Sequence, residues 1–290
     1  MILVGPWTGE VGYEILCWIP FVRAQLRARR IAPLDVLVVS RGGVASWYQD
    51  LATHYVDLFD VCSVEEFRAL TETRRAMNAS VTRRHSDKQL VTLPEDRALA
   101  QQAADRHGVT IDARITPTKM FAVLTALRGR GFDLDEADRH FAAPPRPPVR
   151  RGRPTAVKFD GNMLMPDTPE ARQLAQQLVD GLADPLLLAH PSMDEHATFG
   201  LTGPWRPAVD PATNLGAQTE TLLGCGGFVG TAGGFAYLAS ALGLPVRCYY
   251  HRKAHRLPGV RWALEWVKRR ARRAGVPFSV QELTALARAA

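Results

Sequence analysis

Short apolar runs alternate with longer segments of helical periodicity along most of this chain. In the first half, the apolar runs at 1–4 and 35–40 have the length of strands that are buried on both faces of a parallel sheet. Segments with a helical period of apolar residues are expected as helices, although Pro20 interrupts the stripe in the first of them. These segments are 13–29, 44–54, 63–70, 94–107, 117–129 and 133–141.

The second half repeats this alternation. Strands are expected at 155–159, 185–190, 226–230 and 246–250. Helices are expected at 168–182, 214–224, 234–242, 259–274 and 280–289. Alternating strands and helices predict an α/β architecture, and the second half is Rossmann-like, with ligands expected beyond the carboxyl ends of its strands.

A stretch rich in proline and arginine, 144–154, divides the chain near its middle. Proline lacks the N–H group that a helix interior or a central strand requires, so this stretch is expected as a semi-rigid linker. It separates an N-terminal domain, 1–143, from a C-terminal domain, 155–258. The remaining residues, 259–290, are expected to form a basic helical tail that packs back on the N-terminal domain.

The composition is that of a soluble globular protein, with 46% apolar and 22% charged residues among 290. The apolar runs fall well short of the roughly 20 residues that a membrane span needs, and residues 1–6 lack a signal-peptide pattern. The four cysteines form no C-x-x-C pair, which predicts free thiols in a reducing compartment and disfavours a zinc site. We therefore expect a cytoplasmic location.

Positive charge is concentrated near the C-terminus. Residues 251–273 contain nine Lys or Arg and one acid, while the whole chain carries a net charge of +7. Such a patch suits anionic partners such as lipid headgroups, nucleic acid or an anionic glycan, and a solvated helix face is the alternative. The rest of the chain lacks interleaved aromatic and basic residues, which argues against dedicated nucleic-acid binding.

The most informative segment is 224–243, which predicts a buried strand, a glycine-rich turn and the start of a helix. Gly230, Gly233 and Gly234 leave the backbone bare around Thr231 and Phe235, where the helix begins. Exposed amides at a helix N-terminus, aided by the helix dipole, suit a phosphate group. The alternative is a tight turn that needs glycine for its backbone dihedral angles.

A second glycine-rich turn, 5–14, follows the first expected strand. Gly9 and Gly12 would let a ligand approach the backbone closely. Glu10, in the loop, is a candidate general base, and Glu14, in the first helical turn, is a weaker candidate. Both acids could instead serve only to complement the helix dipole. A dinucleotide-binding G-x-G-x-x-G pattern is absent from this turn.

Polar residues follow or interrupt several other apolar runs. Lys158 lies within an apolar strand, where an ammonium needs a partner or solvent, and at a strand end it would serve a pyrophosphate. Arg41, at the end of the expected strand 35–40 in the first domain, would likewise serve a pyrophosphate. His190 and His196 are six residues apart with a proline between them, a spacing that disfavours a metal site. Asp194 and His196 are instead expected to bind ligand hydroxyls or phosphates, or to form a polar loop. Gln218 lies one turn into a helix and is expected to face the ligand.

Taken together, these segments resemble bacterial polysaccharide-biosynthesis glycosyltransferases of the GT-B type. The motifs that carry the resemblance are Gly5-Pro6-Trp7-x-Gly9-Glu10-x-Gly12-Tyr13-Glu14, Val39-Ser40-Arg41-Gly42-Gly43, Val157-Lys158-Phe159, Asp194-Glu195-His196, Asn214-Leu215-x-x-Gln218 and Phe228-Val229-Gly230-Thr231-x-Gly233-Gly234-Phe235-x-Tyr237-Leu238-Ala239. The resemblance implies two Rossmann-like domains that face each other across a cleft. It also implies a nucleotide-sugar donor on the C-terminal domain and a glycan acceptor on the N-terminal domain.

The resemblance further implies metal-independent transfer without a cofactor. Glu10 would take the proton of an acceptor hydroxyl, and the diphosphate would leave toward the amides at 231–235 with help from Lys158 or Arg41. Gln218, Asp194 and His196 would orient the donor. The alternatives are a sugar-nucleotide epimerase or hydrolase on the same fold, or a non-catalytic binder of anionic ligands. Motifs of serine hydrolases, metalloproteases and P-loop NTPases are absent from the sequence.

The tail contains Trp262 and Trp266, one helical turn apart, followed by five basic residues. A basic helix with aromatic residues can lie on an anionic membrane, which would suit a lipid-linked acceptor and a peripheral position at the inner face. The alternative, which we favour for the two tryptophans, is that they pack the tail back across the two domains.

Overall fold

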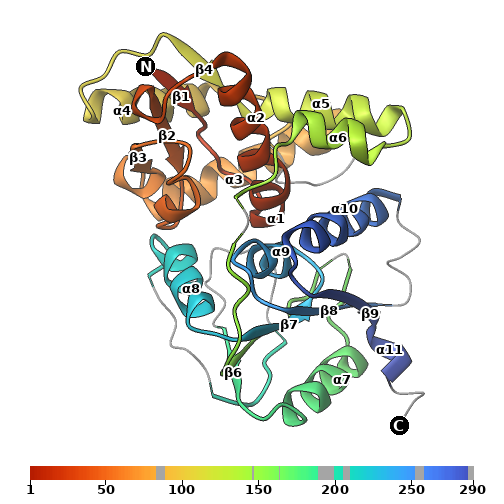
Figure 1. Cartoon of the computed structure of the whole chain (residues 1–290). Helices are drawn as coiled ribbons and strands as arrows, with labels where there is room; N and C mark the ends of the chain where they lie inside the picture. The colour runs from red at the N-terminus through yellow and green to blue at the C-terminus, as the bar shows by residue number, and fades with distance from the viewer. Residues whose placement is uncertain are drawn as a thin grey trace. The chain divides into compact units, whose positions relative to one another are not determined.

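The computed structural model describes residues 1–82, 89–145, 147–162, 164–188, 199–204, 210–251 and 258–286. The chain forms two compact units (Figure 1). The first contains Met1–Ala143 and the short segment Pro211–Gly216, and the second contains Pro144–Asp210 and Ala217–Ala290. Each unit has its own parallel sheet flanked by helices, which confirms the expected α/β class with two Rossmann-like sheets.

The first unit has a four-stranded sheet of order β3-β2-β1-β4, in which every neighbouring pair is parallel. Its strands are β1 (Ile2–Val4), β2 (Val36–Ser40), β3 (His54–Asp57) and β4 (Ala113–Ile115). Its helices are α1 (Val11–Tyr13), α2 (Ile19–Arg29), α3 (Val64–Thr82), α4 (Pro94–Arg106), α5 (Pro117–Gly129) and α6 (Leu134–His140). The strand order reverses between β1 and β4, and such a reversal is where α/β sheets bind ligands.

The segment between α1 and α2 is a π-helical turn, Glu14–Trp18, so the chain is helical from Val11 to Arg29 without a break. Pro20, expected to interrupt this helix, lies in the first turn of α2. Pro20 lies two residues after the π turn, so the N–H group that proline lacks falls where the helical hydrogen bonds change from the π to the α register. Single π turns occur frequently at functional sites.

The helix expected at 44–54 is wrong. The apolar residues Val44, Trp47, Tyr48 and Leu51 have helical spacing and are buried, but they lie on successive tight turns, with Trp47 N donating to Val44 O and Leu51 N to Tyr48 O. Strand β3 then begins at His54. Residues 41–53 form the crossover that the parallel pair β2 and β3 requires, and they do so without a regular α-helix. Strand β4 was not expected, and α3 extends well beyond the expected end at residue 70.

The second unit has a five-stranded parallel sheet of order β6-β5-β7-β8-β9. Its strands are β5 (Thr155–Lys158), β6 (Pro185–Leu187), β7 (Gly227–Thr231), β8 (Val246–Tyr250) and β9 (Phe278–Glu282). The helices are α7 (Pro169–Asp180), α8 (Asn214–Leu223), α9 (Gly234–Ala241), α10 (Pro258–Ala274) and α11 (Leu283–Leu286). In this doubly wound order the reversal lies between β5 and β7.

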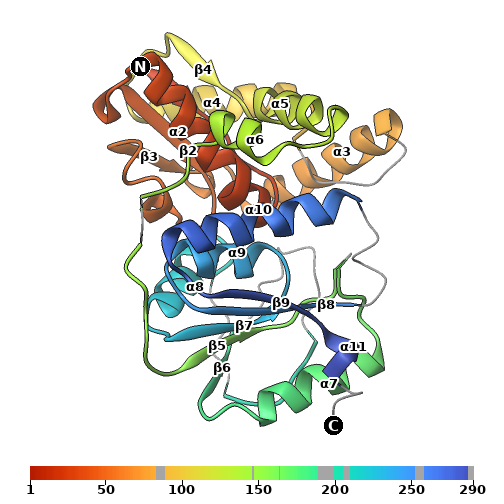
Figure 2. The same cartoon turned by 45° about the vertical axis from the view of Figure 1, so that its right-hand side comes forward.

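The expectation of an entirely helical tail is wrong. Residues 278–282 form β9, which pairs with β8 in parallel, and the whole tail clusters with the second unit. Helix α10 is therefore the crossover between two parallel strands, and Figures 1 and 2 show it on the same side of the sheet as α9, with α7 and α11 on the other side. Trp266 is fully buried, so this tryptophan is not exposed for contact with a membrane.

The expected linker forms neither helix nor strand in its described residues, and it packs on the second unit. Arg150 N donates to Gly243 O at 2.9 Å, and the Arg150 guanidinium donates to the carbonyls of Leu242 and Leu223. A Cβ atom on Gly243, whose φ is +87°, would lie 2.1 Å from Pro148 O. Glycine is required there both for its dihedral angle and for this close approach.

Candidate functional site

Two clusters of polar residues lie at the carboxyl ends of the two sheets, one in each unit. In the second unit, Lys158 is the last residue of β5 and is paired in register with Gly230 of β7. The Lys158 side chain is only 3% exposed. Its Nζ donates to Gln218 Oε1 at 3.0 Å and lies 4.3 Å from the centre of the Phe235 ring. An ammonium group is thus held beside the start of α9 by an amide oxygen and an aromatic face.

Helix α9 begins directly after this ammonium. Gly233 is its N-cap and offers no side-chain cap, and the first turn of the helix contains no acidic residue. Among the described residues, the nearest atom to a Cβ on Gly233 would be the Asn162 amide nitrogen at 3.6 Å. Because the first amides of a helix have no intrahelical partner, this helix start adds positive potential to that of Lys158. The two features together suit a phosphate group.

Gly230 and Thr231 have structural explanations. A Cβ atom on Gly230 would lie 2.0 Å from Lys158 O, so pairing of β7 with β5 requires glycine there. The Thr231 hydroxyl accepts from Asp160 N at 3.0 Å and donates to Asp160 O at 3.2 Å, which fixes the turn after β5. Both residues therefore shape the edge that carries Lys158, while Gly233 and Gly234 provide the helix start.

In the first unit, Glu14 is fully buried where the π-helical turn begins. Its Oε1 accepts hydrogen bonds from Ser40 Oγ and from Tyr48 Oη, each at 2.6 Å. Within the described part of the chain, Oε2 accepts no hydrogen bond. Burial raises the pKa of Glu14 from 4.5 to about 7, against the lowering effects of the Arg41 charge and of the two hydrogen bonds.

Glu10 is partly exposed and is the N-cap of α1, just beyond the carboxyl end of β1. The Arg41 guanidinium donates to Gly9 O, next to Glu10, and packs over the Phe67 ring at 5.6 Å. Gly12 lies within α1 and is half-buried. The structure thus brings Gly9, Glu10 and Arg41 together at one sheet edge, and the buried Glu14 lies behind them.

Three residues that support the candidate site of the first unit were not identified from the sequence. Ser40 and Tyr48 hold Glu14, and the Asp57 carboxylate accepts from the amides of Gly42 and Gly43, which fixes the turn after β2. Ser40 ends a buried strand, a position that could have drawn attention to it. No feature of the sequence pointed to Tyr48 or Asp57. Tyr48 lies in the segment that was expected to be a helix, and Asp57 lies in strand β3, which was not expected.

Asp194 and His196, expected to orient a ligand, lie outside the described residues. Within the described ranges, no group of three or more His, Cys, Asp or Glu side chains is arranged to hold a metal ion. The four cysteines are free thiols. Among the helices that the structure describes, none combines the length and the apolar character that crossing a membrane requires.

No protein-family model and no curated protein matches the chain. Among solved structures, the E. coli heptosyltransferase WaaC with ADP is 14% identical, with a TM-score of 0.43 over 97% of this chain and 92% of that chain. The glycosyl transferase family 9 protein from Veillonella parvula DSM 2008 is 12% identical, with a TM-score of 0.43 over 97% and 85%. The E. coli ADP-heptose LPS heptosyltransferase II is 12% identical, with a TM-score of 0.44 over 95% and 99%.

Proposed function

We propose that this chain is a GT-B-type glycosyltransferase that moves a sugar from a nucleotide-diphosphate sugar to a hydroxyl of a glycan acceptor. The second unit holds the donor and the first unit activates the acceptor. Glu10 takes the proton of the acceptor hydroxyl, whose oxygen bonds to the anomeric carbon. The bond from that carbon to the diphosphate oxygen breaks, and the nucleoside diphosphate leaves as an anion. The reaction needs no metal ion and no cofactor.

The observation that carries this proposal is the buried ammonium of Lys158 at the start of α9. A buried cation is costly unless an anion or strong hydrogen bonds stabilise it. The Gln218 amide oxygen and the Phe235 ring are among the contacts of the Lys158 ammonium and hold it at this edge of the sheet. Both positive features lie at the strand-order reversal of the sheet, between β5 and β7. A departing diphosphate would be stabilised there by a fixed charge and by fixed backbone dipoles.

Glu10 is the better base of the two glutamates in the first unit. Its partial exposure at the end of β1 lets a substrate hydroxyl reach it, whereas Glu14 is fully buried and accepts from two neighbouring hydroxyls. Glu14 is a positioning residue in this proposal, because it joins the π-helical turn to β2 and Tyr48. Asp194 and His196 remain proposed donor contacts that sequence alone supports.

The test is a binding and turnover series on the full chain. Thermal shift with ADP, UDP and GDP, each with and without an attached sugar, should identify one nucleotide that raises the melting temperature. Lys158→Met should weaken that binding by roughly tenfold or more, the usual cost of losing a hydrogen bond to a charged group. Arg247→Met is the matched control, since Arg247 is an exposed cation on β8 of the same sheet.

Glu10→Gln should leave nucleotide binding unchanged and lower turnover about 100-fold or more, the range of general-base catalysis. Wild-type activity in this variant would remove Glu10 as the base. Release of the sugar, or a change in its configuration, without any acceptor would instead favour a hydrolase or an epimerase. Binding of anions with no turnover for any donor would favour a non-catalytic binder.

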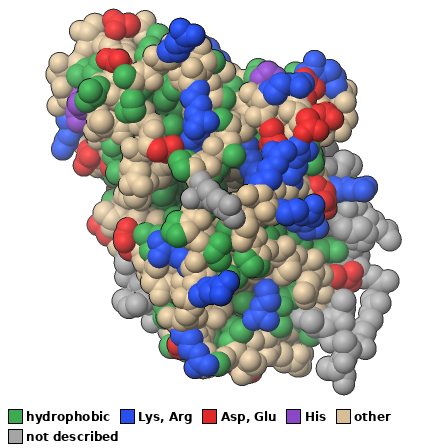
Figure 3. Space-filling view, viewed as in Figure 1, with side chains coloured by type: hydrophobic (Ala, Val, Ile, Leu, Met, Phe, Trp, Pro, Cys, Tyr) green, Lys and Arg blue, Asp and Glu red, His purple; other side chains and the backbone are tan. Residues whose placement is uncertain are grey.

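A peripheral position at the inner face of a membrane, with a lipid-linked acceptor, is also a proposal. Basic side chains gather over α10 in Figure 3, and Lys268 and Arg272 lie on this helix. The apolar side of α10 is already buried through Leu264, Trp266 and Val267, so membrane contact would depend on charge. Sedimentation with anionic and with neutral liposomes tests it, and equal binding to both would contradict it.

A further inference from the structure

A pocket in the first unit is lined by residues that neither the proposed base nor the proposed donor site uses. Gly5 and Pro6, directly after β1, line one part of it, and Arg114 and Thr116, at the end of β4, line another. The pocket therefore lies where the strand order of the first sheet reverses, the same topological position that Lys158 occupies in the second sheet.

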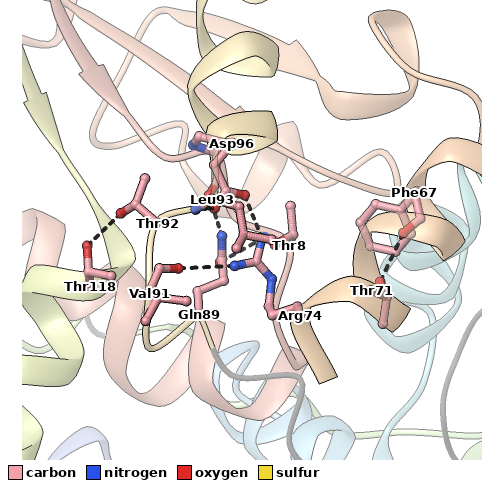
Figure 4. Close-up of polar contacts among 11 residues, drawn as sticks. Thr8, Phe67, Thr71, Arg74, Gln89, Val91, Thr92, Leu93, Asp96 and Thr118 are labelled. Atoms are coloured by element: carbon pink, nitrogen blue, oxygen red, sulfur yellow. Dashed lines mark hydrogen bonds and ion pairs between the residues drawn. The ribbon is translucent and has the colours of Figure 1, made fainter. Parts of the chain in front are cut away.

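The pocket carries net positive charge. Arg97 of α4 and Arg114 of β4 both line it, and neither guanidinium makes an ion pair or a hydrogen bond within the described residues. Asp96 supplies the one carboxylate among the described lining residues. That carboxylate lies 2.6 Å from the Arg74 guanidinium and also accepts from Leu93 N at 2.8 Å (Figure 4). Arg74 neutralises the charge of Asp96. The positive charges of Arg97 and Arg114 are therefore available to an external anion.

Hydroxyl groups complete the lining. Thr118 Oγ1 lies 3.0 Å from Thr92 Oγ1 and 2.9 Å from Thr116 Oγ1, so three hydroxyls form a short chain. Figure 4 shows Thr92 and Thr118 directed toward each other from separate segments. A hydroxyl can donate or accept, so this chain can rotate its protons toward a bound oxyanion.

The pocket is connected to the loop that carries Glu10. Gln89, 2% exposed, lines the pocket and accepts from Thr8 N at 2.9 Å while it donates to Pro6 O at 3.0 Å. The same side chain therefore bonds both ends of the segment 6–8, two residues before Glu10. Figure 4 shows Gln89 beside Thr8. A group bound in the pocket lies against the loop that positions the proposed base.

We propose that this pocket binds an anionic group, phosphate or carboxylate, of the acceptor. The inference rests on the proposed function for its link to the acceptor, but binding of the anion itself can be tested without turnover. Arginine matches the geometry of both anions, because its planar guanidinium donates two parallel hydrogen bonds to phosphate or carboxylate oxygens. Binding of the acceptor through this group would place its neighbouring hydroxyl by the Glu10 loop.

The test is a titration followed by backbone amide NMR shifts on the full chain at constant ionic strength. The probes are inorganic phosphate, acetate and a hexose phosphate, with chloride as the reference anion. The inference expects saturable shifts at Thr116 and Thr118. It expects Arg97→Gln and Arg114→Gln each to weaken binding about tenfold, as for loss of a charge-assisted hydrogen bond. Arg27→Gln, at an exposed arginine at the end of α2, is the matched control and should change nothing.

The possible results distinguish binding in the pocket from binding at the donor site. They also distinguish a site for free phosphate from a site for the acceptor. Shifts that persist in the double variant Arg97→Gln, Arg114→Gln, or the absence of shifts at Thr116 and Thr118, would overturn the site. Tighter binding of the hexose phosphate than of inorganic phosphate supports an acceptor role, and equal binding overturns that role. Nucleoside diphosphate shifts at Gly233 and Gly234 report separately on the donor site, so failure of one proposal does not imply failure of the other.

Discussion

Replacing Glu14 with glutamine should remove most of one pH-dependent contribution to stability. The Glu14 side chain is fully buried, and burial raises its pKa from 4.5 to about 7. The folded state therefore binds this proton more tightly than the unfolded state. Its contribution to stability is fully present below pH 4.5 and is lost as the pH rises to about 7. At 1.36 kcal/mol per pH unit, the loss amounts to about 3 kcal/mol.

Glutamine is a close replacement, because its Oε1 can still accept from Ser40 Oγ and Tyr48 Oη. We therefore expect the free energy of unfolding of Glu14→Gln, relative to the wild type, to rise by about 2 to 3 kcal/mol between pH 5 and pH 8. Urea denaturation at several pH values measures this difference. Differences between variant and wild type also cancel the titration of the histidines.

Glu66→Gln is the matched control. The backbone and the hydroxyl of Ser63 hydrogen-bond the Glu66 carboxylate and lower its pKa, so it stays ionised throughout this pH range. Its stability difference from the wild type should not change between pH 5 and pH 8. A Glu14→Gln difference that is equally flat would refute the reasoning, because it would mean that Glu14 titrates alike in the folded and unfolded states.

Three further predictions concern stability and can be measured by urea denaturation at pH 7. Arg74→Met should destabilise the protein by roughly 3–5 kcal/mol, because it leaves the Asp96 carboxylate buried without its ion-pair partner; a loss below about 1 kcal/mol would contradict this. Gly230→Ala should disrupt the edge between β5 and β7, since its Cβ atom would lie 2.0 Å from Lys158 O, and unchanged stability would show that the strands can separate. Thr168→Ala should cost about 1 kcal/mol, because the Thr168 hydroxyl caps α7, and Thr168→Ser should restore most of that loss.

The sequence predicted the longer elements well, because they carry enough residues for a periodic pattern. Helix α5, expected at 117–129, has those bounds, and β8 matches 246–250. The strands that were missed are short, edge-located or both, such as β3, β4 and β9. Three to five residues in such a position carry little periodicity, and their pairing depends on partners that are distant in the sequence.

Some residues of the candidate site could likewise be found from the sequence, and others could not. Residues that follow apolar runs, such as Lys158 and Glu10, could be found from the sequence because strand ends are where α/β sheets bind ligands. Tyr48 could not, since its contact with Glu14 spans 34 positions and arises only when β2 and the following turns fold. The pocket around Arg114 depends in the same way on pairing of β4 with β1, which placed two distant segments at one edge.

Each sheet reverses its strand order at the edge where we propose that a ligand binds. The cations at the two edges differ in exposure, and this difference predicts different responses to salt. Lys158 is 3% exposed, whereas Arg97 is exposed and Arg114 is half-buried. At about 0.15 M ionic strength the screening length is about 8 Å in water, and buried charges are screened much less than exposed ones. Raising potassium chloride from 0.05 to 0.5 M should therefore weaken phosphate binding at Thr116 and Thr118 more than nucleotide binding at Gly233 and Gly234. Equal weakening at both sites, measured by the same amide shifts, would mean that the Lys158 ammonium is open to solvent when a ligand binds.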